Sequence, residues 1–569
     1  MKILFYHANN PVPQSLFKGT QLYMSITHLY LKTYLELNKP EIAKDIEWCL
    51  PLQLRLSDEE LISIIEKEKP DLFCITHYIW NTEFLQEQLP RIKSKVSSDI
   101  LFVSGGPSID VNINPNFFKE NEYIDYAFYG AGEQGFAEFV ERRMTGKKLN
   151  PFELSNIAWR EENIAEPIIA GYKYVPQLKI SPFTHNAEIF EQMVKQMQSL
   201  GYHPVIPYEL TRGCPYACTF CDWNSGFTNK TTRRKESYKE EIDLFQQVGV
   251  KHIYFADANI GQYAEDLDMI DYMAQKNIQE GAGFVIDGNF SKLRKDNNLK
   301  IYHMMGKSDM CFHFVISVQD INPVILENID RPDVGWDEHT RIINELTANY
   351  PDKPANIQLI QGLPGQTVES WRKTLKEVTD TQNITLIIFV NELLSASPAA
   401  RNQEYIDKWK IKYSKAKRWD EVRKVEFRGN FSMESTTYTR ENYVEMAMLS
   451  AIYSAIALFR NNTPVKVHFD KEAVVETFLQ SKQYEMLKEN LYTNWVENDR
   501  YYWTIDFNGK ITKDPMSGCH LSGIVANDWS INTTFLSWVA NNLLSDTHSK
   551  SQYVREILKF RKDGNTVWV

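Results

Sequence analysis

The stretch TRGCPYACTFCDWN, Thr211–Asn224, contains three cysteines within eight residues: Cys214, Cys218 and Cys221. The chain has seven cysteines in 569 residues, and the other four stand singly at positions 49, 74, 311 and 519. An odd number of scattered cysteines is typical of a reducing compartment, where thiols stay free instead of forming disulfides. We therefore interpret this stretch as a metal-binding loop.

The ligand set of this loop favours an iron–sulfur cluster. A structural zinc site usually has a second pair of ligands about 12 to 20 residues away, but no Cys or His occurs between Cys221 and His252. Three thiolates can bind three irons of a [4Fe-4S] cluster and leave the fourth iron open to a chelating substrate. A different metal remains the alternative.

The loop follows the first of six apolar runs that alternate with helical patterns between residues 204 and 396. Such alternation predicts an α/β fold, and six units fit a partial (β/α)6 barrel better than a flat sheet. In barrels the loops at the carboxyl ends of the strands carry the chemistry. The expected strands are VIPYEL (205–210), HIYFADA (252–258), GFVIDG (283–288), CFHFVISV (311–318), NIQLIQGLPG (356–365) and LIIFVNEL (386–393).

Residues 1–145 show a second strand and helix alternation, which predicts a doubly wound parallel sheet. Ser57 and Glu60 form a capping box before an apolar stripe, and Pro70 ends that helix. The expected strands are KILFYHA (2–8), DLFCITHY (71–78), ILFVSGGP (100–107) and YIDYAFYGAGE (123–133).

The rest of the chain is less informative. We assign 146–203 to a connector and 397–569 to a mainly helical C-terminal domain, rich in Trp and Tyr, that encloses substrate. A net charge of −11 argues against general affinity for nucleic acid or anionic lipid. The start MKILFYHANN is expected to be a strand rather than a signal peptide, and no apolar run approaches the roughly 20 residues of a membrane span. A cytoplasmic location is expected.

The wider string RGCPYACTFCDWN resembles the radical S-adenosylmethionine (SAM) superfamily, and in particular its cobalamin-dependent, B12-binding family. Four further segments are similar to that family in the expected order. They are THYIWNTE (76–83), SGGP (104–107), YGAGEQGF (129–136) and GLPGQT (362–367). Together they extend over about the first 400 residues.

The resemblance implies that Cys214, Cys218 and Cys221 hold the cluster and that SAM binds its open iron. Asp257 is equally well explained as a helix cap, and Gln319 as a buried side chain satisfied by backbone. The expected SAM contacts are Phe220, Asp257, Asn259, Ser317, Gln319, Gly362 and Pro364.

The resemblance also implies a cobalamin site in the crevice of the first sheet. The chain lacks the Asp-x-His-x-x-Gly string whose histidine binds cobalt in many cobalamin domains, and the family commonly lacks it too. An aromatic cluster under a loop and ordinary glycine turns are the structural alternatives. The expected contacts are His77, Tyr78, Trp80, Asn81, Ser104, Gly105, Gly106, Gly130, Gly132 and Glu133.

The activity implied is methylation of an unactivated carbon, in which one SAM supplies the methyl group through cobalamin and another supplies a radical. Rearrangement or cyclisation without methyl transfer, non-radical methyl transfer, and a non-catalytic iron–sulfur or cobalamin sensor are the alternatives. The expected partners are a small-molecule or peptide substrate and an electron donor such as flavodoxin or ferredoxin, with no nucleic acid and no membrane.

Overall fold

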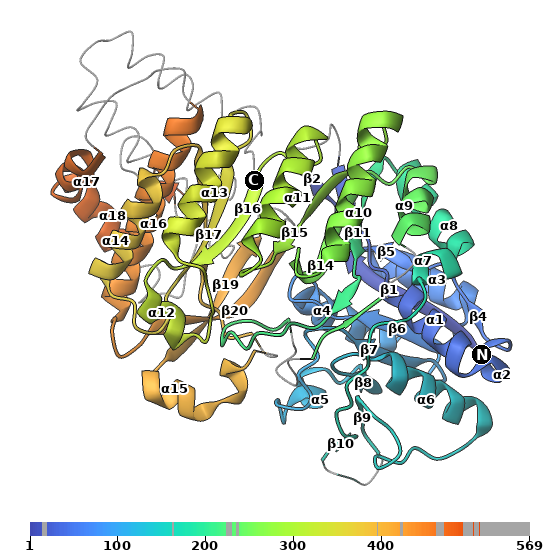
Figure 1. Cartoon of the computed structure of the whole chain (residues 1–569). Coiled ribbons are helices and arrows are strands. Elements are labelled where there is room, and N and C mark those ends of the chain that lie inside the picture. Colours follow the sequence, from blue (N-terminus) through green and yellow to red (C-terminus); the bar gives the residue numbers. More distant parts are fainter. Residues whose placement is uncertain are drawn as a thin grey trace.

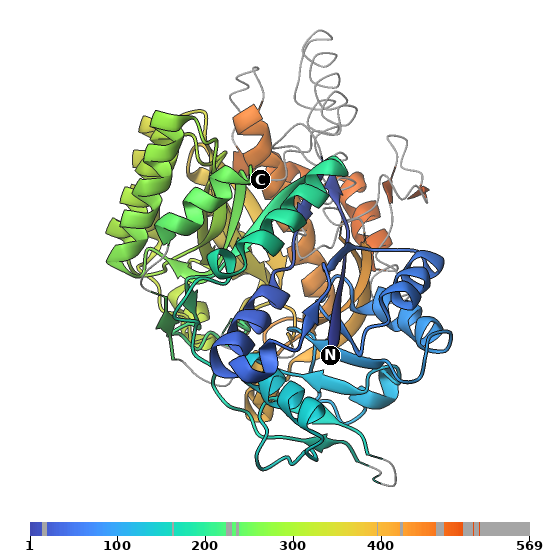
Figure 2. The ribbon, with the colours of Figure 1, turned by 90° about the vertical axis from the view of Figure 1, so that its right-hand side faces the viewer.

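The computed structural model describes residues 1–13, 20–161, 164, 166–223, 230–234, 238–394, 397–420, 425–462, 471–492, 504–505 and 511–512. Its N-terminal part, blue to cyan, lies beside a larger part, green to yellow, that contains the cysteine loop (Figures 1 and 2). Each part is built around its own β-sheet.

The first sheet contains the four strands expected from residues 1–145. Its order is β10-β9-β8-β7-β6-β1-β4, with β5 also paired to β1, and the pairs from β4 to β8 are parallel. The antiparallel β9 and β10 extend one edge. The bounds are β1 Lys2–Asn9, β4 Glu47–Trp48, β5 Leu52–Leu54, β6 Leu72–Thr76, β7 Leu101–Gly105, β8 Tyr126–Phe128, β9 Ile157–Trp159 and β10 Ile168–Ile169.

Helices cover both faces of this sheet. Successive side chains of each strand point to opposite faces, so the apolar side chains on each face pack against the helices on that side. Ile3 and Phe5 of β1 belong to the core formed with α1 and α6, whereas Leu4 and Tyr6 belong to the core formed with α3 and α4. The expected capping box of Ser57 and Glu60 is present at the start of α3. The helices are α1 Thr27–Asn38, α2 Pro40–Ala43, α3 Asp58–Glu68, α4 Thr82–Lys93, α5 Phe117–Glu120 and α6 Glu133–Thr145.

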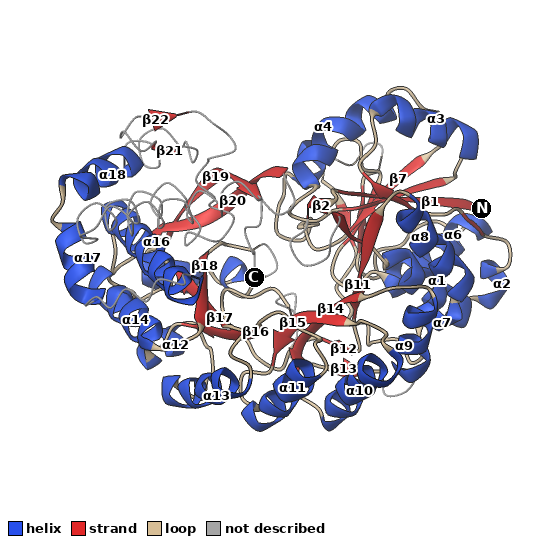
Figure 3. Ribbon diagram, turned by 90° about the horizontal axis from the view of Figure 1, so that it is seen from above, coloured by secondary structure: helices blue, strands red, loops and turns tan. Residues whose placement is uncertain are grey.

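All six expected strands of the partial barrel are present. They form two parallel groups, with β11, β14 and β15 in one sheet and β16, β17 and β18 in another. Helices α10, α11 and α13 lie along the outside of the curved row of strands (Figure 3). The strands are β11 Tyr202–Tyr208, β14 His252–Ile260, β15 Val285–Phe290, β16 Phe314–Gln319, β17 Ala355–Gln361 and β18 Ile384–Val390. The helices are α9 Tyr238–Gln247, α10 Ala264–Gln275, α11 Lys295–Lys307, α12 Pro323–Asn328, α13 Trp336–Asn349 and α14 Val368–Asp380.

One strand from the start of the chain joins the barrel. Strand β3, Thr20–Tyr23, pairs in parallel with β11, and the short β2, Val12–Pro13, pairs with β3. Gln53 fixes the crossing segment, because its side-chain amide both donates to the Ser25 carbonyl and accepts from the Ser25 N–H, each at 2.9 Å. The start of the chain therefore supplies strands to both sheets: β1 to the first sheet, and β2 and β3 to the sheet of the barrel.

The remaining described elements flank the barrel. Helices α7, Pro182–His185, and α8, Ala187–Ser199, lead into β11. Beyond the barrel the described part is helical with antiparallel strands, a mixture that the sequence prediction did not contain. It comprises α15 Gln403–Trp409, β19 Lys412–Asp420, β20 Val425–Glu434, α16 Arg440–Asn462, α17 Lys471–Leu479, α18 Lys482–Tyr492, β21 Thr504–Ile505 and β22 Ile511–Thr512. Within the described ranges, no helix has the length and apolar character of a membrane span.

Candidate active site

A cavity of about 890 Å³ lies between the two sheets. Its walls come from the carboxyl ends of the first sheet, from the crossing segment 23–27, and from β11, β14 and the cysteine loop. Open parallel sheets bind ligands at the carboxyl ends of their strands, and barrels do the same. The fold therefore directs the ligand-binding ends of both sheets toward one space.

The cysteine loop is fixed at its start by hydrogen bonds to Asp257, in the second half of β14. The two carboxylate oxygens of Asp257 accept from the N–H groups of Leu210 and Thr211 at 2.7 and 2.9 Å. Burial, reinforced by the charge of Asp266, raises the pKa of Asp257 to about 7. Asp257 thus binds the loop backbone, a role that differs from the helix cap considered from the sequence.

Gly213 allows the loop to turn immediately before its first cysteine. Its φ is +90°, and a Cβ added there would lie 2.2 Å from the carbonyl oxygen of Lys230. The short strands β12, Thr211–Arg212, and β13, Thr232–Arg233, pair beside it. A side chain at position 213 would push these strands apart, so the position requires glycine.

The three cysteine side chains of the loop are free thiols with different surroundings. Cys214 and Cys218 are buried and Cys221 is half-buried. Asn259 Nδ2 donates to Cys214 Sγ at 3.2 Å, and Lys292 Nζ donates to Cys218 Sγ at 2.8 Å. Burial raises the pKa of the Cys221 thiol to about 12, so loss of its proton requires a compensating positive charge such as a bound metal.

This donor set fits a cluster better than a single ion. Among the residues that the structure describes, no three Cys, His, Asp or Glu side chains converge on one metal position. A [4Fe-4S] cluster does not need such convergence, because each thiolate binds a different iron. Cys214, Cys218 and Cys221 would hold it, and the nitrogen donors from Asn259 and Lys292 suit sulfurs that carry negative charge.

The other residues expected to contact SAM lie at the carboxyl ends of the barrel strands. Gln319 has a φ of +66°, and its buried Oε1 lacks a hydrogen-bond partner, so the sequence alternative of backbone satisfaction does not hold for this atom. Ser317 Oγ donates to Gln358 Oε1 at 2.6 Å. Phe220 packs against an apolar cluster formed by Ile325, Leu326, Ile329, Ile360 and Leu363.

The GLPGQT turn is covered by the C-terminal part of the chain. Gly362 has a φ of +84°, and its carbonyl accepts from Tyr438 Oη at 2.7 Å and Asn391 Nδ2 at 3.0 Å. The Pro364 carbonyl accepts from Asn328 Nδ2 at 3.1 Å. Neither Gly362 nor Pro364 lines the large cavity, and whether they contact SAM stays a prediction.

Most residues expected to contact cobalamin line the large cavity. The rings of Tyr78 and Trp80 stack there, with centroids 4.5 Å apart and planes 7° from parallel. Gly106 has a φ of +118°, and a Cβ at this position would lie 2.4 Å from the His77 carbonyl oxygen. The expected residues found in the lining are Tyr78, Trp80, Ser104, Gly105, Gly106, Gly130, Gly132 and Glu133.

His77 and Asn81 do not line this cavity. His77 is buried beside Tyr123, with Nε2 3.5 Å from the Tyr123 hydroxyl, and burial lowers the pKa of His77 to about 3. Asn81 Nδ2 donates to the carbonyls of His7 and Thr76 at 2.8 and 2.9 Å, while its Oδ1 accepts from the Tyr78 N–H at 2.7 Å. Both residues shape the loop whose aromatic rings face the cavity.

Polar atoms in the cavity wall suit a large ligand with polar edges. Ser104 Oγ, Glu133 Oε2 and Asn9 Nδ2 are buried, line the cavity and lack hydrogen-bond partners. Buried polar atoms are normally paired, so a ligand that bonds to them would be stabilised. The flat stacked rings, the closely approaching glycine backbone and these atoms together fit a corrin bound in this crevice.

Arg212 is a site residue that the sequence analysis did not identify. Its guanidinium lies 2.8 Å from Glu133, the first residue of α6, and 3.0 Å from Glu209 after β11, and it lines the cavity. Burial alone would lower the pKa of Arg212, but these two carboxylates raise it above its usual range. The sequence signal for Arg212 was its position two residues before Cys214. The sequence around Lys292 and Asn9 contains no comparable signal.

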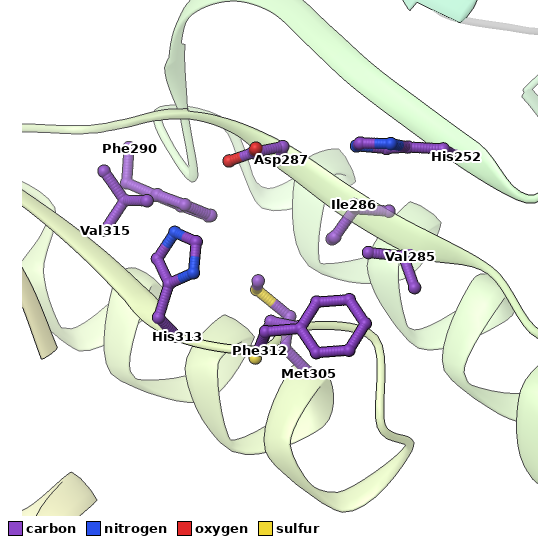
Figure 4. Close-up of a pocket in the computed structure, with 10 residues that line it drawn as sticks. His252, Val285, Ile286, Asp287, Phe290, Met305, Phe312, His313 and Val315 are labelled. Carbon is purple, nitrogen blue, oxygen red and sulfur yellow. The ribbon is translucent and has the colours of Figure 1, made fainter. Parts of the chain in front are cut away.

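A second, small pocket lies between residues of β14, β15, α11 and β16 (Figure 4). It has room for about 10 Å³ and is lined by Asp287 and His313, among others. It is separate from the cysteine loop, because no described residue of that loop lines it. Its size suits one water molecule.

Known proteins are similar to this chain in the sequence of the barrel and in the fold. The radical SAM superfamily model matches residues 208–378. The cobalamin-dependent radical SAM methyltransferase TokK of Streptomyces tokunonensis is 27% identical over 356 residues, which are 62% of this chain and 51% of TokK. The 2-(S-pantetheinyl)-carbapenam-3-carboxylate methyltransferase of Streptantibioticus cattleyicolor is 26% identical over 357 residues, with the same two shares of 62% and 51%. The chain thus spans about half the length of these curated relatives.

A solved structure extends the similarity of fold to nearly the whole chain. The cobalamin-dependent S-adenosylmethionine radical enzyme OxsB, with aqua-cobalamin and S-adenosylmethionine bound, superposes with a TM-score of 0.56. The match covers 99% of this chain and 84% of OxsB, at 14% identity. The radical SAM superfamily model matches the barrel, and the similarity of fold to OxsB includes the sheet before it: in both parts this chain is similar to cobalamin-dependent radical SAM enzymes.

Proposed function

We propose that this protein is a cobalamin-dependent radical SAM methyltransferase that methylates an unactivated carbon of a peptide or small-molecule natural product. The observation that carries the proposal is the single cavity onto which both the glycine-lined edge of the first sheet and the cysteine loop open. The two methyltransferases among the curated relatives support methyl transfer over the other reactions of the family.

The residues of this chain would bind, orient and enclose the reactants. When bound, the cluster and SAM supply a radical that removes hydrogen, and cobalamin supplies the methyl group. Tyr78, Trp80 and Gly106 would hold the corrin from the first sheet, and Cys214, Cys218 and Cys221 would hold the cluster on the barrel. Holding reactive groups on two sides of one cavity would bring them to the substrate, and a bound substrate would displace water from between them.

The cofactors are tested first with full-length protein reconstituted anaerobically. We expect about four irons and four sulfides per chain, about one corrinoid in a base-off form after addition of hydroxocobalamin, and reductive cleavage of SAM. Cys218→Ala should lose iron and SAM cleavage, whereas Cys74→Ala, outside the loop, should retain both. Full iron content and activity in Cys218→Ala would refute the cluster assignment, and failure to bind any corrinoid would refute the cobalamin site.

The reaction is tested with SAM that carries a deuterated methyl group and with peptide and small-molecule fractions of the host. We expect a labelled product together with one S-adenosylhomocysteine and one 5'-deoxyadenosine per methyl group, since methyl donor and radical precursor are separate molecules. Deoxyadenosine without homocysteine or methylation would indicate rearrangement or cyclisation. Homocysteine without deoxyadenosine would indicate non-radical transfer, and absence of SAM cleavage would indicate a sensor.

Partners and location stay proposals. A low-potential flavodoxin or ferredoxin would supply the electrons, and the cytoplasm would keep the loop thiols reduced. Replacing dithionite with reduced flavodoxin in the cleavage assay tests the first of these. The negative net charge of −11 is consistent with our proposal that no nucleic acid takes part.

A further inference from the structure

Lys292 is a cationic side chain that contacts a cysteine of the loop from another unit of the barrel. It follows β15, and its Nζ donates to Cys218 Sγ at 2.8 Å. The same Nζ lies 4.4 Å from the centroid of the Tyr216 ring, within the loop. A cation between a thiolate and the face of a ring is stabilised by both, so these two contacts fix the ammonium beside one cysteine.

The backbone before Lys292 is fixed as well. The Ser291 N–H donates to the Ile260 carbonyl at 2.8 Å, and Ser291 Oγ donates to Gln262 Oε1 at 3.0 Å. Asn298 Nδ2 donates to the Ser291 carbonyl at 2.6 Å. Lys292 therefore extends from an anchored turn toward the loop, and the contact does not depend on a freely moving chain segment.

The three thiols differ in the donor that each receives. Cys218 receives the charged ammonium of Lys292, Cys214 receives the neutral amide of Asn259 at 3.2 Å, and Cys221 receives the backbone of Trp223. A charged donor acts on a thiolate about twice as strongly as a neutral one. The contact with Cys218 is therefore the strongest electrostatic contact among the three.

We infer that Lys292 is a positioning residue that raises the reduction potential of the cluster. The inference rests on the cluster assigned under the proposed function. When a reductant such as dithionite gives one electron to the cluster, the negative charge on cluster and thiolates increases by one. A fixed positive charge beside Cys218 stabilises this more negative state, and hydrogen bonds to the sulfurs act in the same direction. Lys292 would make the cluster easier to reduce before any substrate is bound.

The test is a redox titration of the reconstituted full-length protein, followed by electron paramagnetic resonance in the absence of SAM. Lys292→Met removes charge and donor, Lys292→Gln keeps a neutral donor, and Lys292→Arg keeps both. Lys300→Met, at an exposed position of α11, is the matched control. We expect the midpoint potential to fall in the order Arg, Gln, Met, with the Arg variant and the control close to the parent protein.

Iron and sulfide content separates this inference from the cluster assignment. Full iron content in Cys218→Ala would refute the cluster site itself. A Gln or Met variant that retains iron and has the midpoint potential of the parent would refute the role of Lys292. Should Lys292→Met fail to retain iron, the midpoint potential of Lys292→Gln is compared with that of the parent protein, and this comparison tests the role of Lys292. An unchanged potential together with weaker SAM binding would assign Lys292 to SAM instead and overturn the inference.

Discussion

The two walls of the cavity use different parts of the protein. On the barrel side, Arg212, Gly213, Asp222 and Trp223 of the cysteine loop line the cavity. Behind them, side chains carry the chemistry: Cys214 and Cys218 receive hydrogen bonds from Asn259 and Lys292, and Asp257 fixes the loop. On the wall of the first sheet, shape carries it, through stacked rings, glycines and unpaired polar atoms. A site that depends on reactive side chains can be recognised in the sequence from a few residues. A site that depends on shape can be recognised only once the fold is known.

The contact between the two walls provides the largest expected effect. Arg212→Met removes the cation between Glu133 and Glu209, so that Glu133 loses its ion-pair partner and Glu209, among the described residues, keeps only the hydrogen bond from Gln177. Loss of one partner of a buried pair costs about 3–5 kcal/mol, and chemical denaturation would measure this fall in the free energy of unfolding. Arg91→Met, whose side chain is 56% exposed beside Asp58, should cost about 0–1 kcal/mol. Equal effects for both variants would show that the two walls do not depend on Arg212.

Gly106→Ala tests the wall that relies on shape. The added Cβ would lie 2.4 Å from the His77 carbonyl at a φ of +118°, and such strain costs about 1–3 kcal/mol. We expect corrinoid binding, followed by absorbance, to weaken about 10- to 100-fold while iron content stays normal. Gly146→Ala also has a positive φ, but its Cβ has nothing within 4 Å, so corrinoid binding should not change there. Unchanged binding in Gly106→Ala would contradict the assignment of this wall.

Asp257→Asn tests the anchor of the other wall. An amide can accept from only one of the Leu210 and Thr211 N–H groups, and the loss of a buried partner costs about 1–3 kcal/mol. At pH 8, above the pKa of about 7 for Asp257, the loop should release iron faster during desalting. Asp271→Asn, at an exposed position of α10, should retain iron like the parent. Faster release from both variants would show an effect unrelated to the anchor.

Acid should loosen the first sheet through His77. Burial depresses the pKa of His77 from 6.5 to about 3, so the folded state binds fewer protons than the unfolded state between these values. The contribution is fully present above pH 6.5 and is lost as pH falls toward 3, with about 1 kcal/mol lost by pH 5.5. Chemical denaturation at pH 6.5 and 5.5 would measure the free energy of unfolding. The fall between these pH values should be smaller in His77→Gln than in His203→Gln, an exposed control. An equal dependence in both variants would exclude this cause.

The regular elements could be predicted from the sequence, and the pairings between distant segments could not. All six barrel strands and the helix beginning after Ser57 were expected from apolar periodicity and capping. Strand β3 has only four residues, and its position is determined by pairing with β11, far away in sequence. The β20 hairpin strand had a signal that was missed, because Val425, Phe427, Phe431 and Met433 alternate with other residues.

At the site, residues that act together and lie close together along the chain could be recognised from the sequence. The cysteine loop is such a case, whereas Lys292 reaches Cys218 only because β15 ends beside the loop. His77 shows the limit of reasoning from neighbours along the chain: Tyr78 and Trp80 line the cavity and His77 does not, so its contact with cobalamin stays a prediction. Which side of a loop faces a ligand is decided by tertiary packing. The predictions on residues 513–569, and on Cys519, lie outside the described residues.

The strand that crosses from the first sheet to the barrel limits how this protein can be divided. Residues 20–23 pair with β11, so a fragment cut near residue 145 would carry an unpaired strand and leave the edge of the barrel uncovered. Exposed strand edges promote aggregation. Chimeric enzymes that exchange the first module between relatives would therefore have to exchange the crossing strand and its partner β11 together. For engineering, the smallest unit to exchange is therefore the pair of modules joined by this strand.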